Sequence, residues 1–293
     1  MGSNMKLAIK IDIDTLRGYT EGLPKLLNVL SEHKIHASIF FSLGPDNSGK
    51  AIRRIFRKGF ITKMFRTKAT SAYGIRTMLY GTLLPAPMIA QSNPDLIRRA
   101  LYEGHDCGIH SWDHVYWQDN LPKLSREDIR SEFNKALELY EKISGERAKS
   151  CAAPGWQVTR ESLRVQDELD FDYCSDVRGY APFMPELDGV TFRTPQVPST
   201  LPTMDEALVY VPRDKLNDYY MNLLHEGLNV HTIHTEMEGG MMYETFREFL
   251  TRCRDNNVEF MTLREALRNS ELIHSRIEQG NLKGRAGKLA VQA

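Results

Sequence analysis

The stretch Leu7-Ala8-Ile9-Lys10-Ile11-Asp12-Ile13-Asp14 decides the fold of this chain. Its apolar residues alternate, as they do in a β-strand that buries one face. Asp12 and Asp14 stand at the carboxyl end and point the same way, because they are two residues apart. Two carboxylates are costly to bury without partners, so this strand end is a candidate site. The alternative is a pair of loop aspartates that cap the next helix.

Strand and helix patterns then alternate along the chain. We expect further strands at 37–42, 106–109, 150–153, 172–175, 190–193, 229–234 and 258–262. Amphipathic helices are expected at 23–30, 96–103 and 129–140, the last preceded by an N-cap pair, Ser125 and Asp128. Repeated β-then-α order predicts an α/β fold with a parallel sheet covered by helices.

Polar residues end several of these strands: Asp12 and Asp14, His110, Asp176 and His234. In a parallel barrel such ends converge on one face, which holds the active site. An open doubly wound sheet would bring together residues from fewer strands. No Gly-x-Gly-x-x-Gly motif or phosphate-binding loop occurs, so nucleotide binding has no support.

Composition excludes some classes of partner. The 293 residues carry 38 acidic and 38 basic side chains, a formal net charge of zero, so we expect no nucleic-acid partner. The four cysteines have no CxxC spacing and are expected to be reduced, mostly buried thiols. We expect no signal peptide, and no apolar run is long enough to span a bilayer.

One segment, 47–94, interrupts the pattern as an insertion. It contains no Asp or Glu but nine Lys and Arg residues. Its first part has the spacing of an amphipathic helix whose apolar face would enter an anionic membrane surface. The residues expected to contact the membrane are Ile52, Arg53, Arg54, Phe56, Arg57 and Phe60. The alternative is a basic helical hairpin packed on the barrel with its charges solvated.

The pair His110 and His114 has the spacing of two metal ligands, on a helix or across a tight turn that leaves a strand. Two imidazoles and the Asp14 carboxylate would make an open site for a divalent metal ion, with Asp12 as the spare carboxylate that takes a proton from water. Alone, two histidines are more often surface residues. His234, at the end of an apolar strand, is by itself more often a core residue. The pair Asp176 and Arg178 is by itself more often a solvated salt bridge.

The order of these motifs resembles the polysaccharide deacetylase family, also called NodB-homology domains or carbohydrate esterase family 4. The aspartates match its first motif, His110 and His114 the second, Asp176 loosely the fourth and Ile233-His234 the fifth. At the third motif the family has an arginine that orients the base, and Ala152 stands there instead; Arg178 is a candidate replacement. The resemblance implies a NodB-like distorted (β/α) barrel of seven or eight parallel strands. It would be a single domain over 5–287 that carries the insertion 47–94.

Seven stretches resemble one branch of the family more closely: IDIDTLRG, EGLPKLL, ASIFFSLGPDNSG, HSWDHVYWQ, SDVRG, QVPSTLPTMDE and TIHTEMEGG. That branch removes formate from a 4-deoxy-4-formamido-L-arabinose linked to undecaprenyl phosphate, in lipid A modification and polymyxin resistance. The resemblance implies a peripheral enzyme on the cytoplasmic face of the bacterial inner membrane. A deacetylase of the same family that acts on another N-acylated sugar is the alternative. A non-catalytic binding module is disfavoured because the set of site residues is complete.

The expected roles follow from residue chemistry and the resemblance. Asp14, His110 and His114 would hold zinc, cobalt or manganese, all of which suit this ligand set. Asp12 would be the base and His234 the acid, with Asp176 orienting His234. A backbone N–H near Gly155-Trp156 would stabilise the oxyanion. Arg17, Arg178 and Glu236 are candidates for contacts with the sugar and the phosphate.

Overall fold

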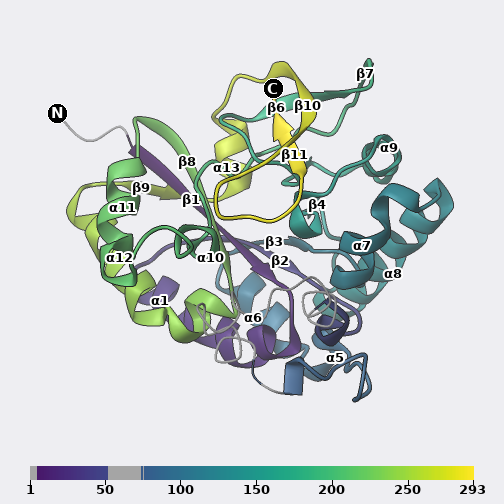
Figure 1. Cartoon of the computed structure of the whole chain (residues 1–293), viewed down its shortest axis with the longest axis horizontal. Helices are drawn as coiled ribbons and strands as arrows, with labels where there is room; N and C mark the ends of the chain where they lie inside the picture. The colour runs from purple at the N-terminus through teal and green to yellow at the C-terminus, as the bar shows by residue number, and fades with distance from the viewer. Residues whose placement is uncertain (1–4, 52–73, 75) are drawn as a thin grey trace.

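The computed structural model describes residues 5–51, 74 and 76–293 (Figure 1). At its centre is a sheet of seven parallel strands, in the order β5-β4-β3-β2-β1-β8, with β9 paired to β1. They span Met5–Ile13 (β1), Ser38–Phe41 (β2), Asp106–Ile109 (β3), Ser150–Cys151 (β4), Tyr173–Cys174 (β5), Gly227–His234 (β8) and Glu259–Met261 (β9). All of their pairings are parallel, which confirms the predicted sheet.

The long strand β1 distorts the barrel. It pairs with β8 along Met5–Asp12. The other edge of β1 pairs with two strands: β9 at Lys6–Ala8 and β2 at Lys10–Ile13. The sheet therefore splits beside β1, and only the carboxyl half of β1 lies between β2 and β8.

An irregular segment, 195–201, spans the gap between β5 and β8. The Val197 N–H donates to the Cys174 oxygen over 2.8 Å. The N–H groups of Thr200 and Leu201 both donate to the Val230 oxygen, over 3.1 and 3.0 Å. These backbone oxygens at the edges of β5 and β8 thus have hydrogen-bond donors, and the barrel closes without a further regular strand.

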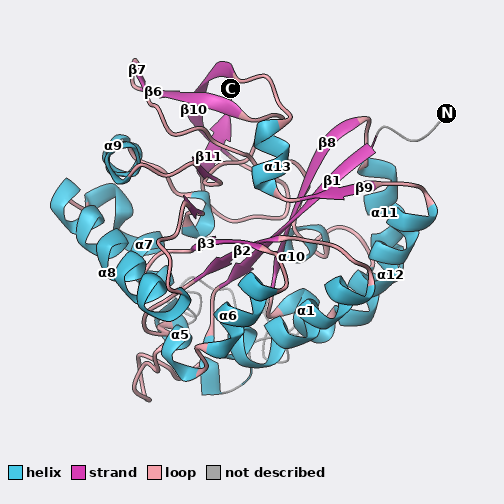
Figure 2. Ribbon diagram, turned by 180° about the vertical axis from the view of Figure 1, so that it is seen from behind, coloured by secondary structure: helices cyan, strands magenta, loops and turns pink. Residues whose placement is uncertain are grey.

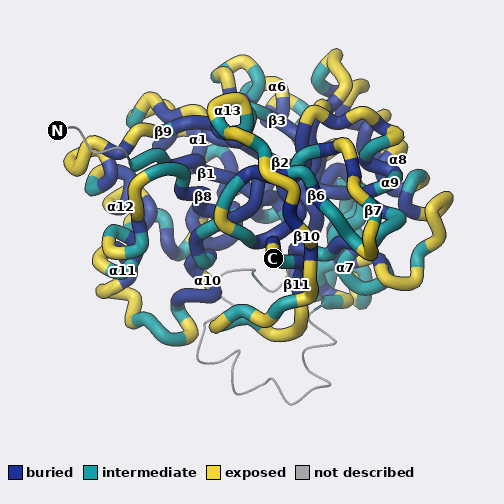
Figure 3. The backbone as a smooth tube through the Cα atoms, turned by 90° about the horizontal axis from the view of Figure 1, so that it is seen from above, coloured by how far each residue is buried: buried dark blue, intermediate teal, exposed yellow. Residues whose placement is uncertain are grey.

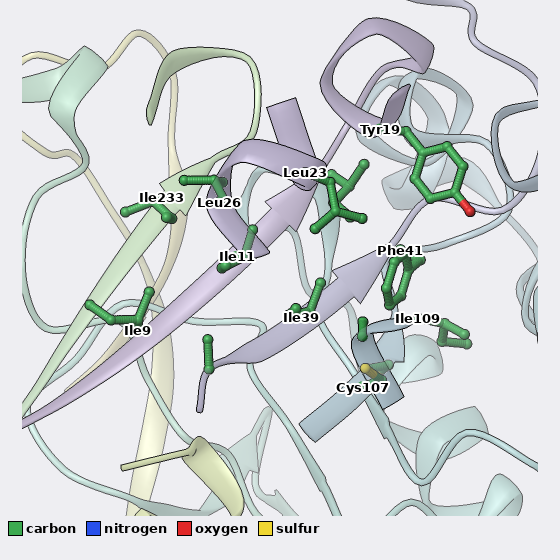
Figure 4. Packing of buried hydrophobic residues seen from close by; sticks show 14 of the residues in the cluster. Ile9, Ile11, Tyr19, Leu23, Leu26, Ile39, Phe41, Cys107, Ile109 and Ile233 are labelled. Carbon is green, nitrogen blue, oxygen red and sulfur yellow. The ribbon is translucent and has the colours of Figure 1, made fainter. Parts of the chain in front are cut away.

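The two faces of β1 have opposite surroundings. Ile9 and Ile11 point outward and pack in the large core cluster with Leu23 and Leu26 of α1 (Leu23–Glu32) (Figure 4). Ala8 belongs to the smaller cluster inside the barrel. Lys10 and Asp12 share the parity of Ala8, so they also face the interior. This strand therefore delivers charged groups to the inside of the barrel.

Helices cover the outside of the sheet (Figure 2). The main ones are α1, α6 (Asp95–Tyr102), α8 (Arg126–Ser144), α9 (Arg160–Leu169), α11 (Leu216–Leu223), α12 (Tyr243–Asp255) and α13 (Leu263–Arg268). The predicted N-cap pair is confirmed, since Ser125 and Asp128 form a capping box at the start of α8. Figure 3 shows the buried strands β1, β2 and β8 inside these partly exposed helices.

A second sheet, in the order β11-β10-β6-β7, was not predicted. It comprises β6 (Phe183–Leu187), β7 (Val190–Thr191), β10 (Ile273–Gly280) and β11 (Leu289–Gln292). The strand expected at 190–193 is β7, but it pairs antiparallel with β6 and lies outside the parallel sheet. The cause is local: Asp188 and Gly189 have φ of 52° and 72°, as in a two-residue hairpin turn. Strand β11 lies beyond residue 287, the expected end of the domain.

No helix in the described ranges is long and apolar enough to cross a bilayer.

Candidate active site

A pocket of about 230 Å³ opens at the carboxyl ends of the parallel strands. Its wall includes Asp12, Asp14, His110, His114, Gly155, Trp156, Asp205, His234 and Arg285. The structure thus brings together the predicted base, the predicted acid and the three predicted metal ligands.

One side of the pocket, here called the ligand side, consists of Asp14, His110 and His114. Asp14 Oδ1 lies 3.3 Å from His110 Nε2 and 3.4 Å from His114 Nε2. His110 follows β3, and His114 is the first residue of α7 (His114–Asn120). Between them Ser111 has a φ of 71°, so the chain turns sharply as it leaves the strand. This confirms the turn geometry expected for the histidine pair.

The ligand side fits a divalent cation. The donor atoms of its three residues all lie within 4.8 Å of one another. Asp14 Oδ1 is buried and has no hydrogen-bond partner among the described residues, although a buried carboxylate oxygen needs one. Two imidazole nitrogens and a carboxylate oxygen are a donor set that suits zinc and similar metals.

The protonation states also suit metal binding. Burial tends to raise the pKa of Asp14, but the charges of His114, His234 and His110 outweigh it and hold the pKa well below its usual range. Burial lowers the pKa of His114; the charge of Asp14 opposes this shift, and the neighbouring His110 adds to it. An ionised carboxylate and a neutral imidazole are the forms that bind metals.

Asp12 lies beside the ligand side, and its partner is Lys10. Asp12 is 3% exposed, and its Oδ2 accepts a hydrogen bond of 2.8 Å from Lys10 Nζ. Asp12 Oδ1 is buried and has no partner among the described residues. One carboxylate oxygen is therefore held by the protein, and the other is left to accept a proton.

The opposite side, here called the proton-donor side, consists of His234, Asp205, Trp156 and Arg285. His234 is the last residue of β8, and its Nδ1 lies 3.5 Å from Asp205 Oδ1. Burial lowers the pKa of His234, but the hydrogen bond and charge of Asp205 outweigh it and raise the pKa well above its usual value. In turn, although partial desolvation opposes the shift, the hydrogen bond and charge of His234 lower the pKa of Asp205 to about 2. The pair keeps His234 protonated, as a general acid requires.

The expected contact between Asp176 and His234 is wrong. Asp176 is fully buried, and its Oδ2 accepts from Gln166 over 2.7 Å and from Gln196 over 3.2 Å. Burial raises the pKa of Asp176, although these two hydrogen bonds and the charge of Lys10 oppose the shift. Asp205, in the short helix α10 (Met204–Ala207), stands where Asp176 was expected.

Trp156 has two cationic side chains close to its ring. The guanidinium carbons of Arg178 and Arg285 lie 4.9 and 4.7 Å from its ring centre. Arg178 does not line the pocket; its Nη1 donates to Glu206 over 2.9 Å and its Nη2 to the Leu201 oxygen over 2.7 Å. Arg285 does line the pocket, and its Nη2 donates to the Gly155 oxygen over 3.2 Å.

Gly155 has a backbone conformation that favours glycine. Its φ is 65°, and a Cβ there would lie 2.8 Å from the Gln118 amide nitrogen. The following Trp156 N–H already donates to the Ala153 oxygen over 3.2 Å. Of the two backbone groups expected near the oxyanion, Gly155 N–H is therefore the remaining candidate.

Comparison with known proteins places the chain in a family. The family model described as polysaccharide deacetylase matches residues 8–174. A protein of Shewanella sediminis named "Probable 4-deoxy-4-formamido-L-arabinose-phosphoundecaprenol deformylase ArnD" is 37% identical over 98% of this chain and 95% of its own length. The protein of the same name from Wigglesworthia glossinidia brevipalpis is 31% identical over 92% of this chain and 96% of its own. The chain belongs to the polysaccharide deacetylase family. It is therefore a hydrolase that acts on an amide bond.

Solved structures of polysaccharide deacetylases share the fold. A protein from Mycobacterium smegmatis described as a polysaccharide deacetylase superposes with a TM-score of 0.66 at 17% identity, covering 96% of both chains. The peptidoglycan deacetylase PdaC from Bacillus subtilis gives 0.53 at 16% identity, covering 90% of this chain and 92% of its own. The expected NodB-like distorted barrel is thus confirmed. A pseudoenzyme of carbohydrate esterase family 4 from Bacillus anthracis also matches, with a TM-score of 0.54 at 13% identity over 93% of this chain and 69% of its own, so the fold alone does not show activity.

Besides Arg178, two more predicted substrate contacts of this polysaccharide deacetylase lie outside the pocket wall. The Glu236 carboxylate is 4% exposed, and its Oε1 accepts from the Thr15 N–H and hydroxyl over 2.9 and 2.6 Å. Arg17 lines a neighbouring cavity of about 250 Å³ and donates to Glu21 over 3.0 Å. Gly155 and Trp156 are the predicted contacts that the structure does place at the pocket.

The predicted membrane contacts Ile52, Arg53, Arg54, Phe56, Arg57 and Phe60 lie outside the described residues. The flanks of that stretch are described. Ser48 and Ala51 line the catalytic pocket. A Cβ on Gly74 would lie 2.9 Å from Arg17 Nη1, so this flank returns close to Arg17.

Proposed function

We propose that this chain removes the formyl group from 4-deoxy-4-formamido-L-arabinose carried on undecaprenyl phosphate, giving the free amine and formate for lipid A modification and polymyxin resistance. The observation that carries the proposal is one pocket lined by Asp12, the ligand side and His234, whose pKa Asp205 raises. The named deformylases that resemble the chain over nearly its whole length support the choice of substrate.

Asp14, His110 and His114 would hold the cation, with zinc, cobalt and manganese all compatible with their donor atoms. A divalent cation supplies Lewis-acid activation of the attacking water and of the amide carbonyl. The ligand side has two histidine rings with centroids 5.2 Å apart, both directed at one carboxylate oxygen.

Asp12 and His234 move the protons of the reaction. The free oxygen of Asp12 takes a proton from water while the water oxygen attacks the formyl carbon. The carbon–nitrogen bond then breaks, and His234 gives its proton to the leaving sugar nitrogen. Gly155 N–H would stabilise the oxyanion. Arg285 is a candidate for the substrate phosphate because a guanidinium binds two phosphate oxygens at once.

The alternative within the family is a deacetylase of another N-acylated sugar. To separate the two, the purified full chain is given the 4-formamido sugar and its 4-acetamido counterpart on the same polyprenyl phosphate. Mass spectrometry then follows the released acid. We expect formate release and little acetate, and faster acetate release would overturn the proposed substrate.

We further propose that the insertion holds the enzyme on the anionic cytoplasmic surface of the inner membrane. Support comes from the nine basic and no acidic residues of 47–94 and from exposed apolar residues in its described part, Leu83 at 81% and Leu84 at 37%. Each Lys or Arg near an anionic surface contributes roughly 1 kcal/mol. The polyprenyl tail of the substrate stays in the bilayer, so a surface enzyme could reach the sugar without extracting it.

A liposome sedimentation assay tests this placement. Binding should require anionic lipid and weaken with salt. Replacing Arg53, Arg54, Arg57 and Lys58 by Gln should abolish binding but leave hydrolysis of a water-soluble analogue intact. The matched control replaces Lys123, Lys142, Arg147 and Lys149, four exposed basic residues outside the insertion, and should still bind. Wild-type sedimentation of the first variant would show that the insertion is not the anchor.

A further inference from the structure

We propose that Lys10 is the positioning residue for the base Asp12, in place of the arginine that the third motif lacks. The inference rests on the proposed function, because it needs Asp12 to be the base. Lys10 stands on the same strand, two residues before Asp12, and both side chains face the barrel interior.

Lys10 is an unusual residue for its position. It is 0% exposed, and its only hydrogen bond to a described side chain is the one to Asp12 Oδ2, at 2.8 Å. A buried ammonium without a partner would cost several kcal/mol, so the contact with Asp12 must be kept once the barrel has formed. The cost of burying Lys10 thus fixes the orientation of Asp12.

Aromatic rings complete the surroundings of the ammonium group. Its Nζ lies 5.7 Å from the ring centre of Phe40 and 5.4 Å from that of Trp156. Faces of aromatic rings attract cations at such distances. Trp156 also lines the pocket, so Lys10 joins the base to the opposite wall without itself lining the cavity.

The bonds of Arg178 leave it no such contact with Asp12. Arg178, the replacement expected from the sequence, is bound to Glu206 and to the Leu201 oxygen. Ala152 belongs to the same interior cluster as Phe40, the ring that Lys10 faces. An arginine at 152 would therefore enter the space that Lys10 now fills from β1. The cation that holds the base thus stands on β1 in this chain, whereas the family has it at the third motif, after β4.

The consequence is a carboxylate with one committed oxygen. Lys10 takes Oδ2, and Oδ1 remains buried and free of hydrogen bonds to the described residues. Fixing the base in this way keeps Oδ1 directed at the attacking water. Misplacing a catalytic group by about 1 Å can cost on the order of a hundredfold in rate.

The test compares Lys10→Met, Asp12→Asn and the double variant by formate release from the lipid-linked 4-formamido sugar. We expect Lys10→Met to lower kcat by about a hundredfold, with KM and bound metal as in the wild type. In the Asp12→Asn background the same substitution should cost almost nothing more, because a residue that acts through Asp12 has no role once the base is gone. Lys6→Met, on the same strand and partly exposed, is the matched control and should be fully active.

Restoring a positive charge at position 152 makes the test more specific. Adding Ala152→Arg to Lys10→Met should raise kcat at least about tenfold above that of Lys10→Met alone. A purely structural role for Lys10 would not explain such a recovery. The melting temperature shows whether Lys10→Met folds. If it does not, Lys10→Gln, which keeps a hydrogen-bond donor, replaces it in the comparisons with Asp12→Asn and Ala152→Arg.

The outcomes separate the two proposals. Wild-type kcat in Lys10→Met, or a full loss that repeats in the Asp12→Asn background, would overturn the role of Lys10 and leave the proposed function standing. Wild-type formate release by Asp12→Asn would overturn the proposed base itself.

Discussion

The ligand side and the proton-donor side of the pocket are assembled in different ways. The ligand side comes from the ends of β1 and β3, two parallel strands that flank β2 in the sheet. The proton-donor side combines the end of β8 with Asp205 from α10 and Arg285 from the loop before β11. The register of neighbouring strands positions the ligand side, whereas long connections outside the strands position most of the proton-donor side. Substitutions on the ligand side should therefore remove the metal, and those on the other side should tune an enzyme that still holds it.

The largest effect is expected on the ligand side. His110→Ala or Asp14→Ala should lose bound metal and formate release together, because each removes one of the three donor atoms that the described residues supply. Elemental analysis of the purified variants measures the first loss, and mass spectrometry of formate the second. Full metal occupancy in both variants would remove this assignment.

Asp12→Asn should separate chemistry from metal binding. Its metal content should match the wild type, while kcat falls by about a hundredfold to ten-thousandfold, the contribution of a general base. Steady-state kinetics beside metal analysis checks both halves of the expectation. An active Asp12→Asn enzyme would mean that another group takes the proton.

The proton-donor side predicts a pH effect. The pH dependence of kcat should be bell-shaped, with His234 setting the basic limb. Asp205 raises the pKa of His234, so Asp205→Asn should move that limb to lower pH and reduce kcat near neutral pH on the order of tenfold. His234→Gln should lose the limb. An unchanged profile in either variant would remove His234 from the role of acid.

The same pair predicts a stability effect of fixed sign. The pKa of His234 is raised in the folded state, so the pair stabilises the fold below about pH 6.5, the usual value for histidine in an unfolded chain, and the gain is lost as pH rises through the folded-state value. Asp205→Asn should therefore lower the melting temperature more at pH 6 than at high pH. Because the Asp205 side chain is 47% exposed, water screens the pair and the difference should be small.

The smallest effect is expected at Arg285. Arg285→Met should raise KM for the phosphate-bearing substrate by roughly fivefold to tenfold and leave kcat and metal content nearly unchanged, as the loss of one charge-assisted contact would. Lys283→Met, whose ammonium lies over Tyr210 away from the pocket, is the matched control. Equal KM values in the two variants would mean that Arg285 does not contact the phosphate.

The parallel sheet could be predicted because its signal is local. Alternation along β1 and the apolar runs of β2, β3 and β8 are visible in windows of a few residues. The second sheet was missed because β10 is exposed on most of its length and joins β6 only across a long stretch of chain. No short pattern marks such a pairing.

The residues that line the pocket differ in how clearly the sequence marks them. The ligand side follows from two short motifs, and Asp12 from its spacing to Asp14. Asp205 was passed over because acidic residues in the first turn of a helix are common, and Arg285 because nothing near it in sequence distinguishes it from other basic residues. Lys10 did leave a signal: a lysine on the interior-facing register of a buried strand, next to a carboxylate on the same face.

The most direct test of the central claim is formate release from the lipid-linked 4-formamido sugar by the full chain, measured before chelation, after EDTA and after a divalent metal is returned. The account predicts release that stops with the chelator and recovers with the metal, and no recovery in His110→Ala. Undiminished release by the metal-free protein would contradict it.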